Sequence, residues 1–327
     1  MTTPDTPSVR EELASLAGRS VFFDPLWGNH GDTLIELGAR ELLARADIRL
    51  VKDPRRANAI IVNGSGGMID LRGAALRRLE RYCADYPETS IIVLPSSFLF
   101  TTTDFSAFFE GRTAEAVLFA REQASLEIIS GIQYPTTVRI GMDDDLAFSL
   151  ADTPLMRKLE QRVTNEHILI VERADQEGVT PTTPTNPANQ STPNPTLLRR
   201  IRNAIPQPVR TAAARRVRGR SLRPRQPASD FEKKAYTIAS QEVGDMPAVI
   251  ADISRQDLCS FNRFLDLIAR SAFVVTTRMH VGILAAMLGK PTVMQPGSYH
   301  KIRGVYEQSL NRFDNARLVD LADREPG

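Results

Sequence analysis

An arginine and a histidine stand two positions apart in Arg278-Met279-His280, which two threonines separate from an apolar run that ends at Val275. The run predicts a buried strand, and apolar residues at helical spacing predict a helix from about 281 to 288. In open α/β sheets, ligands bind beyond the carboxyl ends of the strands. Arginine binds oxyanions, and histidine exchanges protons near neutral pH. The pair therefore predicts an anion site with an acid–base group; a helix-capping histidine and a surface ion pair are the alternative.

Two more cations follow predicted strands in the same half of the chain. Arg173 comes after the apolar run at 167–171, and Lys301 lies in the polar segment after the strand that begins at Pro291. Because the carboxyl ends of parallel strands meet at one edge of a sheet, we expect these cations and Arg278 to share one site. Such a group suits a small substrate with more than one anionic group.

Two polar, glycine-containing turns follow strands in the first half. Residues 27–32 (WGNHGD) separate a strand at 21–25 from a helix at 33–44, and residues 63–67 (NGSGG) follow a strand at 59–62. Glycines allow close approach of the backbone, and helix N-termini favour anions. Neither turn matches a Walker or GxGxxG motif. The alternatives are a plain flexible turn, and an N-cap role for Asp32. The candidate site residues here are Asn29, Asp32, Ser65 and Gly66.

Strands and helices alternate along most of the chain, which is typical of doubly wound parallel sheets. The length of 327 residues also favours two domains. We predict an α/β protein with an N-terminal Rossmann-like domain at 18–152 and a C-terminal one at 165–315. Residues 151–165 would connect them.

Composition excludes several classes of protein. No apolar run approaches the length of a membrane span, and the N-terminal segment lacks the pattern of a signal peptide. Cys83 and Cys259 stand far apart without a motif, as expected for buried thiols of a cytosolic protein. Asp143-Asp144-Asp145 predicts a solvated acidic loop rather than a metal site, because consecutive carboxylates rarely point at one ion.

The segment 176–229 is an insert of different composition. A Pro-, Thr- and Asn-rich stretch is followed by an arginine-rich one, and residues 178–229 hold ten arginines but no Asp, Glu or Lys. Apolar residues at helical spacing within 198–225 indicate a basic amphipathic piece that contacts anionic membrane surfaces. Nucleic acid is not expected as a partner, because aromatics and known motifs are missing. A disordered or partly helical, solvated insert is the alternative.

Taken together, these landmarks resemble the polysaccharide pyruvyl transferase family over about 20–175 and 230–310. The matching pieces are short motifs in order: GNHGD at 28–32, NGSGG at 63–67, PSSF at 95–98, ARE at 120–122 with Ser125, ERAD at 172–175, RMH at 278–280 followed by GKP at 289–291, and Lys301. His30 falls on no motif position and receives no role, and the insert at 176–229 departs from the shortest members.

The resemblance implies two Rossmann-like domains that face each other across a cleft, as in GT-B glycosyltransferases. It also implies transfer of pyruvate from phosphoenolpyruvate to two sugar hydroxyls as a cyclic ketal, without a metal or a further cofactor. The C-terminal domain would bind the donor through Arg173, Arg278 and Lys301, with His280 as the acid–base group. The N-terminal domain would face a saccharide or lipid-linked oligosaccharide. The enzyme would be cytoplasmic and peripheral at the inner face of the membrane.

Two other functions are alternatives. A nucleotide-sugar glycosyltransferase of GT-B type also needs basic residues at facing strand ends, and Glu307 is the candidate for holding its donor ribose. A non-catalytic binding or scaffold protein would depend on the basic insert instead. It would tolerate changes of Arg278 and His280.

Overall fold

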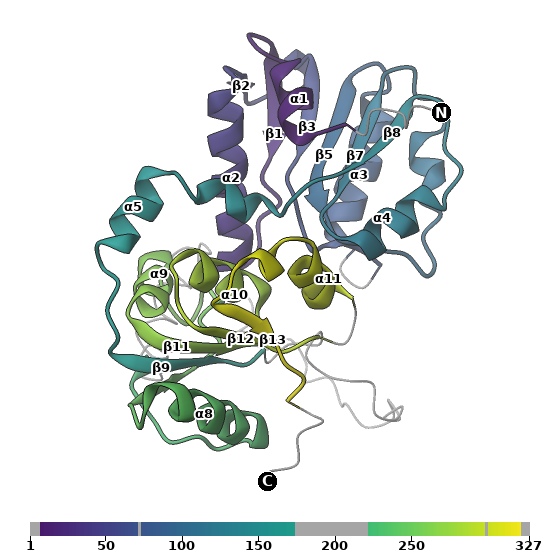
Figure 1. The fold of residues 1–327 in the computed structure, drawn as a ribbon. Coiled ribbons are helices and arrows are strands. Elements are labelled where there is room, and N and C mark those ends of the chain that lie inside the picture. Colours follow the sequence, from purple (N-terminus) through teal and green to yellow (C-terminus); the bar gives the residue numbers. More distant parts are fainter. Residues whose placement is uncertain (1–6, 71–72, 174–221, 298–299, 322–327) are drawn as a thin grey trace, which may run out of the picture.

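The computed structural model describes residues 7–70, 73–173, 222–297 and 300–321 (Figure 1). Its first half contains a six-stranded sheet in which all strands are parallel. In sheet order, the strands are β2 (Arg49–Val51), β1 (Ser20–Asp24), β3 (Ala59–Val62), β5 (Ser90–Ser96), β7 (Ala116–Ala120) and β8 (Val138–Met142). The inner strands are continuous runs of buried apolar residues, as expected for a sheet covered on both faces.

The second half contains a five-stranded sheet, which is also entirely parallel. In sheet order, its strands are β10 (Ala248–Ile250), β9 (His167–Val171), β11 (Ser271–Thr276), β12 (Thr292–Met294) and β13 (Ala316–Leu318). A small two-stranded parallel pair, β4 (Met68–Ile69) and β6 (Phe98–Leu99), accompanies the first sheet. The prediction of an α/β chain with parallel sheets is confirmed.

The two sheets share one strand order. Numbered along the chain within each sheet, the strands lie as 2-1-3-4-5, with a sixth strand added in the first sheet. This is the flavodoxin-type order among doubly wound folds, in which ligands bind at the switch point where the order reverses. The switch point lies between β1 and β3 in the first sheet and between β9 and β11 in the second. The predicted glycine turns follow β1 and β3, and Arg173 and Arg278 follow β9 and β11.

Helices cover both sheets in Figure 1. They are α1 (Val9–Ala14), α2 (His30–Arg45), α3 (Ala74–Asp85), α4 (Gln123–Ser130), α5 (Pro154–Glu160), α8 (Asp230–Val243), α9 (Phe261–Ala269), α10 (Met279–Met287) and α11 (Lys301–Gln308). α2 begins three residues earlier than predicted. α11 begins at Lys301, so this lysine lies in the first turn of a helix and the prediction of a loop position is wrong.

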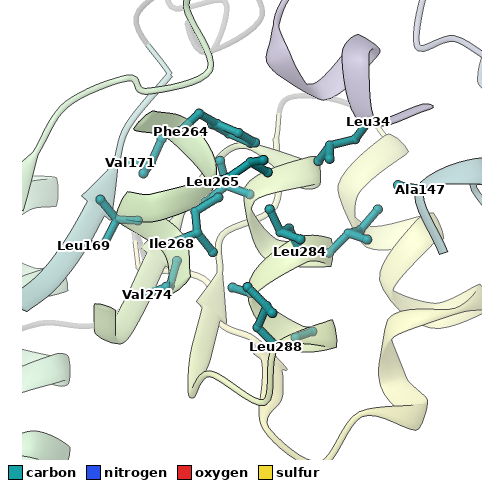
Figure 2. Packing of buried hydrophobic residues seen from close by; sticks show 14 of the residues in the cluster. Leu34, Ala147, Leu169, Val171, Phe264, Leu265, Ile268, Val274, Leu284 and Leu288 are labelled. Carbon is teal, nitrogen blue, oxygen red and sulfur yellow. The ribbon is translucent and has the colours of Figure 1, made fainter. Parts of the chain in front are cut away.

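One apolar cluster joins elements of both halves (Figure 2). Leu34 of α2 and Ala147 of the 3₁₀ helix η3 (Leu146–Leu150) belong to the same buried cluster as Phe264 of α9 and Leu284 of α10. α10 is apolar on nearly every side, and a helix of that composition is stable only when it is buried all round. Its packing therefore fixes where Arg278 and His280, at its N-terminus, lie relative to the first half.

Several predictions concern segments that the structure describes only in part. Residues 176–221 of the insert, with most of the predicted membrane-contact segment 198–225, lie outside the described residues. Near its end, Arg225 forms an ion pair with Glu232 of α8.

No helix in the described ranges is long and apolar enough to cross a membrane. The domain division at 152 and 165 stays a prediction. Cys83 and Cys259 are buried as predicted, and burial raises the pKa of the Cys83 thiol to about 12.

Candidate active site

A cavity of about 460 Å³ lies between loops that follow strands of both sheets. All eight residues predicted for the site line it: Asn29, Asp32, Ser65, Gly66, Arg173, Arg278, His280 and Lys301. It is also lined by residues for which the sequence predicted no role, among them Trp27, Arg78, Arg121 and Ser254. The location agrees with the rule that doubly wound sheets bind ligands at their switch points.

The N-terminus of α2 forms one wall of the cavity. Asn29 caps the helix, because its Oδ1 accepts the Gly31 N–H at 2.7 Å. Asp32 completes a capping box, since its Oδ2 accepts the Asn29 N–H at 2.7 Å. Asp32 is thus the third helical residue, and its interpretation as the N-cap is wrong. The two side chains hold the helix start in place while they face the cavity.

The glycine loop after β3 forms a second wall. Ser65 Oγ accepts the Gly67 N–H at 2.8 Å, and the Ser65 N–H donates to Ser96 Oγ at 3.1 Å. A Cβ added at Gly66 would lie only 3.2 Å from Lys301 Nζ and 3.0 Å from a terminal nitrogen of Arg121. Two cations therefore approach the loop at one point, and glycine leaves room for them.

Arg121 belongs to a buried polar network below the cavity. Its side chain is fully buried, with Nη1 donating to Asp145 Oδ2 at 2.7 Å and Nε donating to Ser97 Oγ at 2.9 Å. Ser97 in turn donates to the buried Glu122 carboxylate at 3.0 Å. His300 reaches the same carboxylate, with 3.5 Å between His300 Nε2 and Glu122 Oε1. Buried charges need such partners, so the network holds Arg121 in a fixed orientation.

Asp145 connects this network to the predicted acid–base residue. Its Oδ2 lies 3.3 Å from Nε2 of His280. Burial by itself raises the pKa of a carboxyl group, but the charge and hydrogen bond of His280, together with the Arg121 charge, outweigh burial. They hold the pKa of Asp145 well below its usual range. Asp145 is therefore an ionised carboxylate that orients the imidazole.

The prediction of a solvated acidic loop at 143–145 is wrong. Asp145 is 1% exposed. Asp143 accepts the Val9 N–H at 3.0 Å, and Asp144 accepts hydrogen bonds from Ser309 and Arg312, each at 2.6 Å. The three carboxylates point to three different places, so each binds its own partner.

The imidazole of His280 packs against the start of α2. A Cβ built on Gly31 would lie 2.4 Å from His280 Nδ1 and 2.9 Å from Asn29 Oδ1. Contacts this short do not occur for a real Cβ, so the ring occupies the space that a side chain at position 31 would need. His280 is thus held between Asp145 on one side and the backbone of Gly31 on the other.

Arg278 is buried, so the alternative of a surface ion pair is wrong. Its Nε donates to Asp252 Oδ1 at 3.0 Å, and Nη2 contacts the other oxygen of the same carboxylate. This two-point pairing fixes the plane of the guanidinium. The Arg173 N–H donates to Thr277 Oγ1 at 2.7 Å, which ties the chain after β9 to the chain after β11.

Residues 253–294 match the family model of polysaccharide pyruvyl transferase. The match confirms the resemblance over the stretch that holds the RMH and GKP motifs, and the other quoted motifs lie outside it. The matched stretch contains Ser254, Arg278 and His280 of the cavity. By its description, that family comprises transferases of pyruvyl groups to polysaccharides.

The fold is similar to that of a functionally uncharacterised protein from Klebsiella pneumoniae subsp. pneumoniae, whose crystal structure is known. The TM-score is 0.59 at 18% sequence identity, and the similarity covers 94% of this chain and 95% of the other. At this identity the likeness concerns the fold alone. No protein of curated function matches the sequence.

His30, the histidine of the first half, has a role in packing. His30 is buried, its Nε2 lies 3.0 Å from the Cys259 carbonyl oxygen, and its ring packs near Phe264. In the described part of the chain, no three or more His, Cys, Asp and Glu side chains are grouped so that they could hold a metal ion. The prediction that no metal takes part rests on the sequence.

Proposed function

We propose that the protein transfers pyruvate from phosphoenolpyruvate to two hydroxyl groups of a saccharide, forming a cyclic ketal and releasing phosphate. The observation that carries this proposal is the placement of His280 between Asp145 and Gly31, in a cavity whose described lining includes Arg121, Arg173, Arg278 and Lys301. The family match over 253–294 supports it. The proposal includes the facing, GT-B-like arrangement of the two halves across this cavity.

The donor carries a phosphate and a carboxylate, so its site needs separate groups of cations. Arg121 and Lys301 approach the same point at Gly66, and we assign the phosphate to them and to the glycine loop. We assign the carboxylate to Arg173 and Arg278, which follow neighbouring strands at the switch point of the second sheet. Asp252 fixes the Arg278 guanidinium, which reduces the reorganisation needed when the anion binds.

The reaction needs a proton at the methylene carbon of the donor while a sugar oxygen bonds to the adjacent carbon. Nε2 of His280 is bound by Asp145, so we assign proton transfer to Nδ1. The carbon–oxygen bond to phosphate then breaks, and the second hydroxyl oxygen closes the ketal ring. One hydroxyl proton ends in the new methyl group and the other on phosphate, so no oxidant, reductant or further cofactor is needed. The cations stabilise the departing phosphate.

We assign the acceptor to the side of the first half. Asn29 and Asp32, at the start of α2, form the cavity wall there, at the switch point of the first sheet. A saccharide carried on a lipid would bring the reaction to the inner face of the membrane, where the arginine-rich segment 198–225 would contact anionic lipid. Binding to anionic liposomes that disappears at high salt is the expected outcome in a flotation assay.

The direct test is incubation of the purified protein with phosphoenolpyruvate and candidate saccharides. We expect phosphate release together with an acceptor that has gained the mass of one pyruvate ketal. His280→Ala should lower turnover by roughly 10²–10⁴-fold, the usual worth of general acid–base catalysis. His167→Gln is the matched control, because His167 is bonded to the Leu267 carbonyl outside the cavity and should keep its turnover.

Two results would contradict the proposal. Full activity of the His280→Ala variant would remove the assigned mechanism. Consumption of a nucleotide sugar, without binding of phosphoenolpyruvate, would favour the glycosyltransferase instead. The residue considered for that function, Glu307, is exposed on α11 and does not line the cavity.

A further inference from the structure

The chain has a single tryptophan, Trp27, whose side chain lies at the cavity and is almost fully exposed to solvent. Trp27 is 86% exposed and lines the cavity. The other exposed large apolar residues in the described part of the chain, Leu50 and Val163, do not line it. Single exposed apolar residues are common on protein surfaces, but an indole is the largest of them. Its position at the edge of a functional cavity makes a binding role the better explanation.

The backbone before Trp27 is strained. Leu26 has a φ of 48°, in the left-handed region that side chains other than glycine rarely adopt. Its side chain is buried, and its N–H donates to Asp24 Oδ1 at 3.3 Å. Asp24 is held in turn by Arg78 Nη1 at 2.7 Å and by the Tyr82 hydroxyl at 2.9 Å. This strained conformation turns the next residue, Trp27, outward, and the surrounding contacts maintain it.

The backbone on both sides of Trp27 is also anchored. Asn63 Nδ2 donates to the Pro25 carbonyl oxygen at 3.0 Å. Gln256 Nε2, from the second half of the chain, donates to the Gly28 carbonyl oxygen at 2.8 Å. Because these bonds hold the backbone in place, only the side-chain torsions of the indole remain to be fixed when a ligand binds.

We propose that the indole of Trp27 is a stacking platform for a pyranose ring of the saccharide acceptor at the mouth of the cavity. This inference rests on the proposed function. The faces of pyranose rings carry C–H groups, which pack on the electron-rich face of an aromatic ring. The hydroxyls at the ring edge remain available for the polar groups beside Trp27, including Asn29, Arg78 and Ser254. Indole also offers a large rigid contact area with only two side-chain torsions.

The kinetic test compares Trp27→Ala with Trp27→Phe. We expect Trp27→Ala to raise the KM for saccharide roughly tenfold, the worth of one aromatic contact, while the KM for phosphoenolpyruvate is unchanged. Trp27→Phe keeps a ring face and should recover part of the loss. Leu50→Ala removes an exposed apolar side chain on β2, away from the cavity, and should change neither constant.

A direct binding test uses the emission of the only tryptophan. Methyl glycosides of glucose, galactose and mannose, with their β-linked disaccharides, serve as probes. We expect at least one of them to shift the emission to the blue in a saturable manner, because stacking removes the indole from water. A double variant, Trp27→Phe with Leu50→Trp, places the indole on β2 and should not respond to any probe.

The outcomes separate this inference from the proposed function. If pyruvate transfer occurs but the Trp27→Ala variant keeps the KM for saccharide, the platform is wrong and the function stands. If no transfer occurs but sugars shift the emission, the platform stands and the pyruvyl donor is wrong. No response to any probe overturns the platform. So does a shift caused by phosphatidylglycerol vesicles and not by sugars, which would make Trp27 a membrane contact.

Discussion

The carboxylate of Asp145 is shared by two basic side chains that come from different sheets. Arg121 follows β7 of the first sheet, and His280 lies at the start of α10, after β11 of the second. Taking three such groups out of water is costly, and their mutual pairing compensates for that cost. Removing one member therefore leaves the others buried without compensation.

Replacement of Asp145 by asparagine is expected to lower the free energy of unfolding by about 3–5 kcal/mol at neutral pH. The pKa of Asp145 is lowered in the folded protein, so its ionised form contributes stability above the unfolded value of about 3.9. That contribution is lost as the pH falls further toward the folded value. The difference between wild type and Asp145→Asn should thus shrink below about pH 4. Urea unfolding at neutral and at successively lower pH measures it.

If the difference in the free energy of unfolding between wild type and Asp145→Asn does not change with pH, Asp145 is not ionised in the folded protein. Asp143→Asn is the matched control, because Asp143 is partly exposed and its carboxylate accepts the backbone N–H groups of Val9 at 3.0 Å and Asp144 at 2.8 Å. We expect the free energy of unfolding of this control to be close to that of the wild type at every pH.

At the residue scale, the sequence predicts well which cations and turns belong to the site. It predicts poorly which charged residues are buried as pairs. Arg278, His280, Arg173 and Lys301 were found because each follows a recognisable strand. Asp145 was missed because three consecutive acids resemble a solvated loop, and its burial depends on partners 24 and 135 positions away. Arg121 carried a signal, the Ala120-Arg121-Glu122 motif, but nothing local indicates that it is fully buried.

At the scale of elements, two helices begin at the cavity and meet there. α2 follows β1, α10 follows β11, and each starts at the switch point of its sheet. The first turn of α2 lies against the first turn of α10 through Gly31 and His280. The position of the imidazole thus depends on how closely the two helices approach.

Gly31→Ala tests this dependence. The added Cβ would lie 2.4 Å from His280 Nδ1, so the ring must move. Alanine favours a helix by about 1 kcal/mol over glycine, so helix propensity gives no reason for α2 to be destabilised. A displacement near 1 Å is enough to lower turnover by roughly 10²-fold. Steady-state kinetics and thermal unfolding on the same sample measure both effects.

The control is Gly297→Ala, whose Cβ would meet, among the described residues, only Ile302 Cδ1 at an ordinary 3.8 Å. It should keep its turnover. An active Gly31→Ala enzyme would mean that the imidazole is not held where the structure places it.

Periodicity located most elements but not their ends. The predicted strands at 59–62 and 167–171 coincide with β3 and β9. The predicted start of α2 is too late because Asp32 resembles an N-cap. The cap is Asn29, and the Asp32 side chain accepts a hydrogen bond from the Asn29 backbone. No strand was predicted at 316–318, where β13 has three residues and depends on pairing with β12.

At the scale of the whole molecule, the apolar cluster around α10 joins the two halves. Leu34 of α2 is buried in it together with Phe264 and Leu284 of the second half (Figure 2). Burial of apolar surface is the main stabilising contribution to such a junction. The two halves should therefore unfold together, because separating them would expose this core.

Leu34→Ala is expected to lower the free energy of unfolding by about 2–5 kcal/mol, the usual result of removing a buried leucine side chain. Unfolding should remain a single transition, with far-UV and near-UV circular dichroism changing at the same urea concentration. Leu50→Ala, at an exposed leucine, should change stability by no more than about 0.5 kcal/mol. Two separate transitions in the wild type would show that the cluster does not couple the halves.

The overall plan was easier to predict than the junction. Alternating strands and helices define two parallel sheets from sequence alone. Which helices pack between the sheets depends on residues such as Leu34 and Leu284, which share one buried cluster although they lie 250 positions apart and leave no local pattern.

The close contact between Gly31 and His280 also limits which residue types can occur together in related sequences. The imidazole of His280 occupies the volume that any side chain at position 31 would fill. In homologues, the two positions should therefore vary together: glycine at the first wherever histidine stands at the second. A homologue with a larger residue at the first position should carry a smaller residue at the second, and it would have lost the proton-transfer chemistry while keeping the fold.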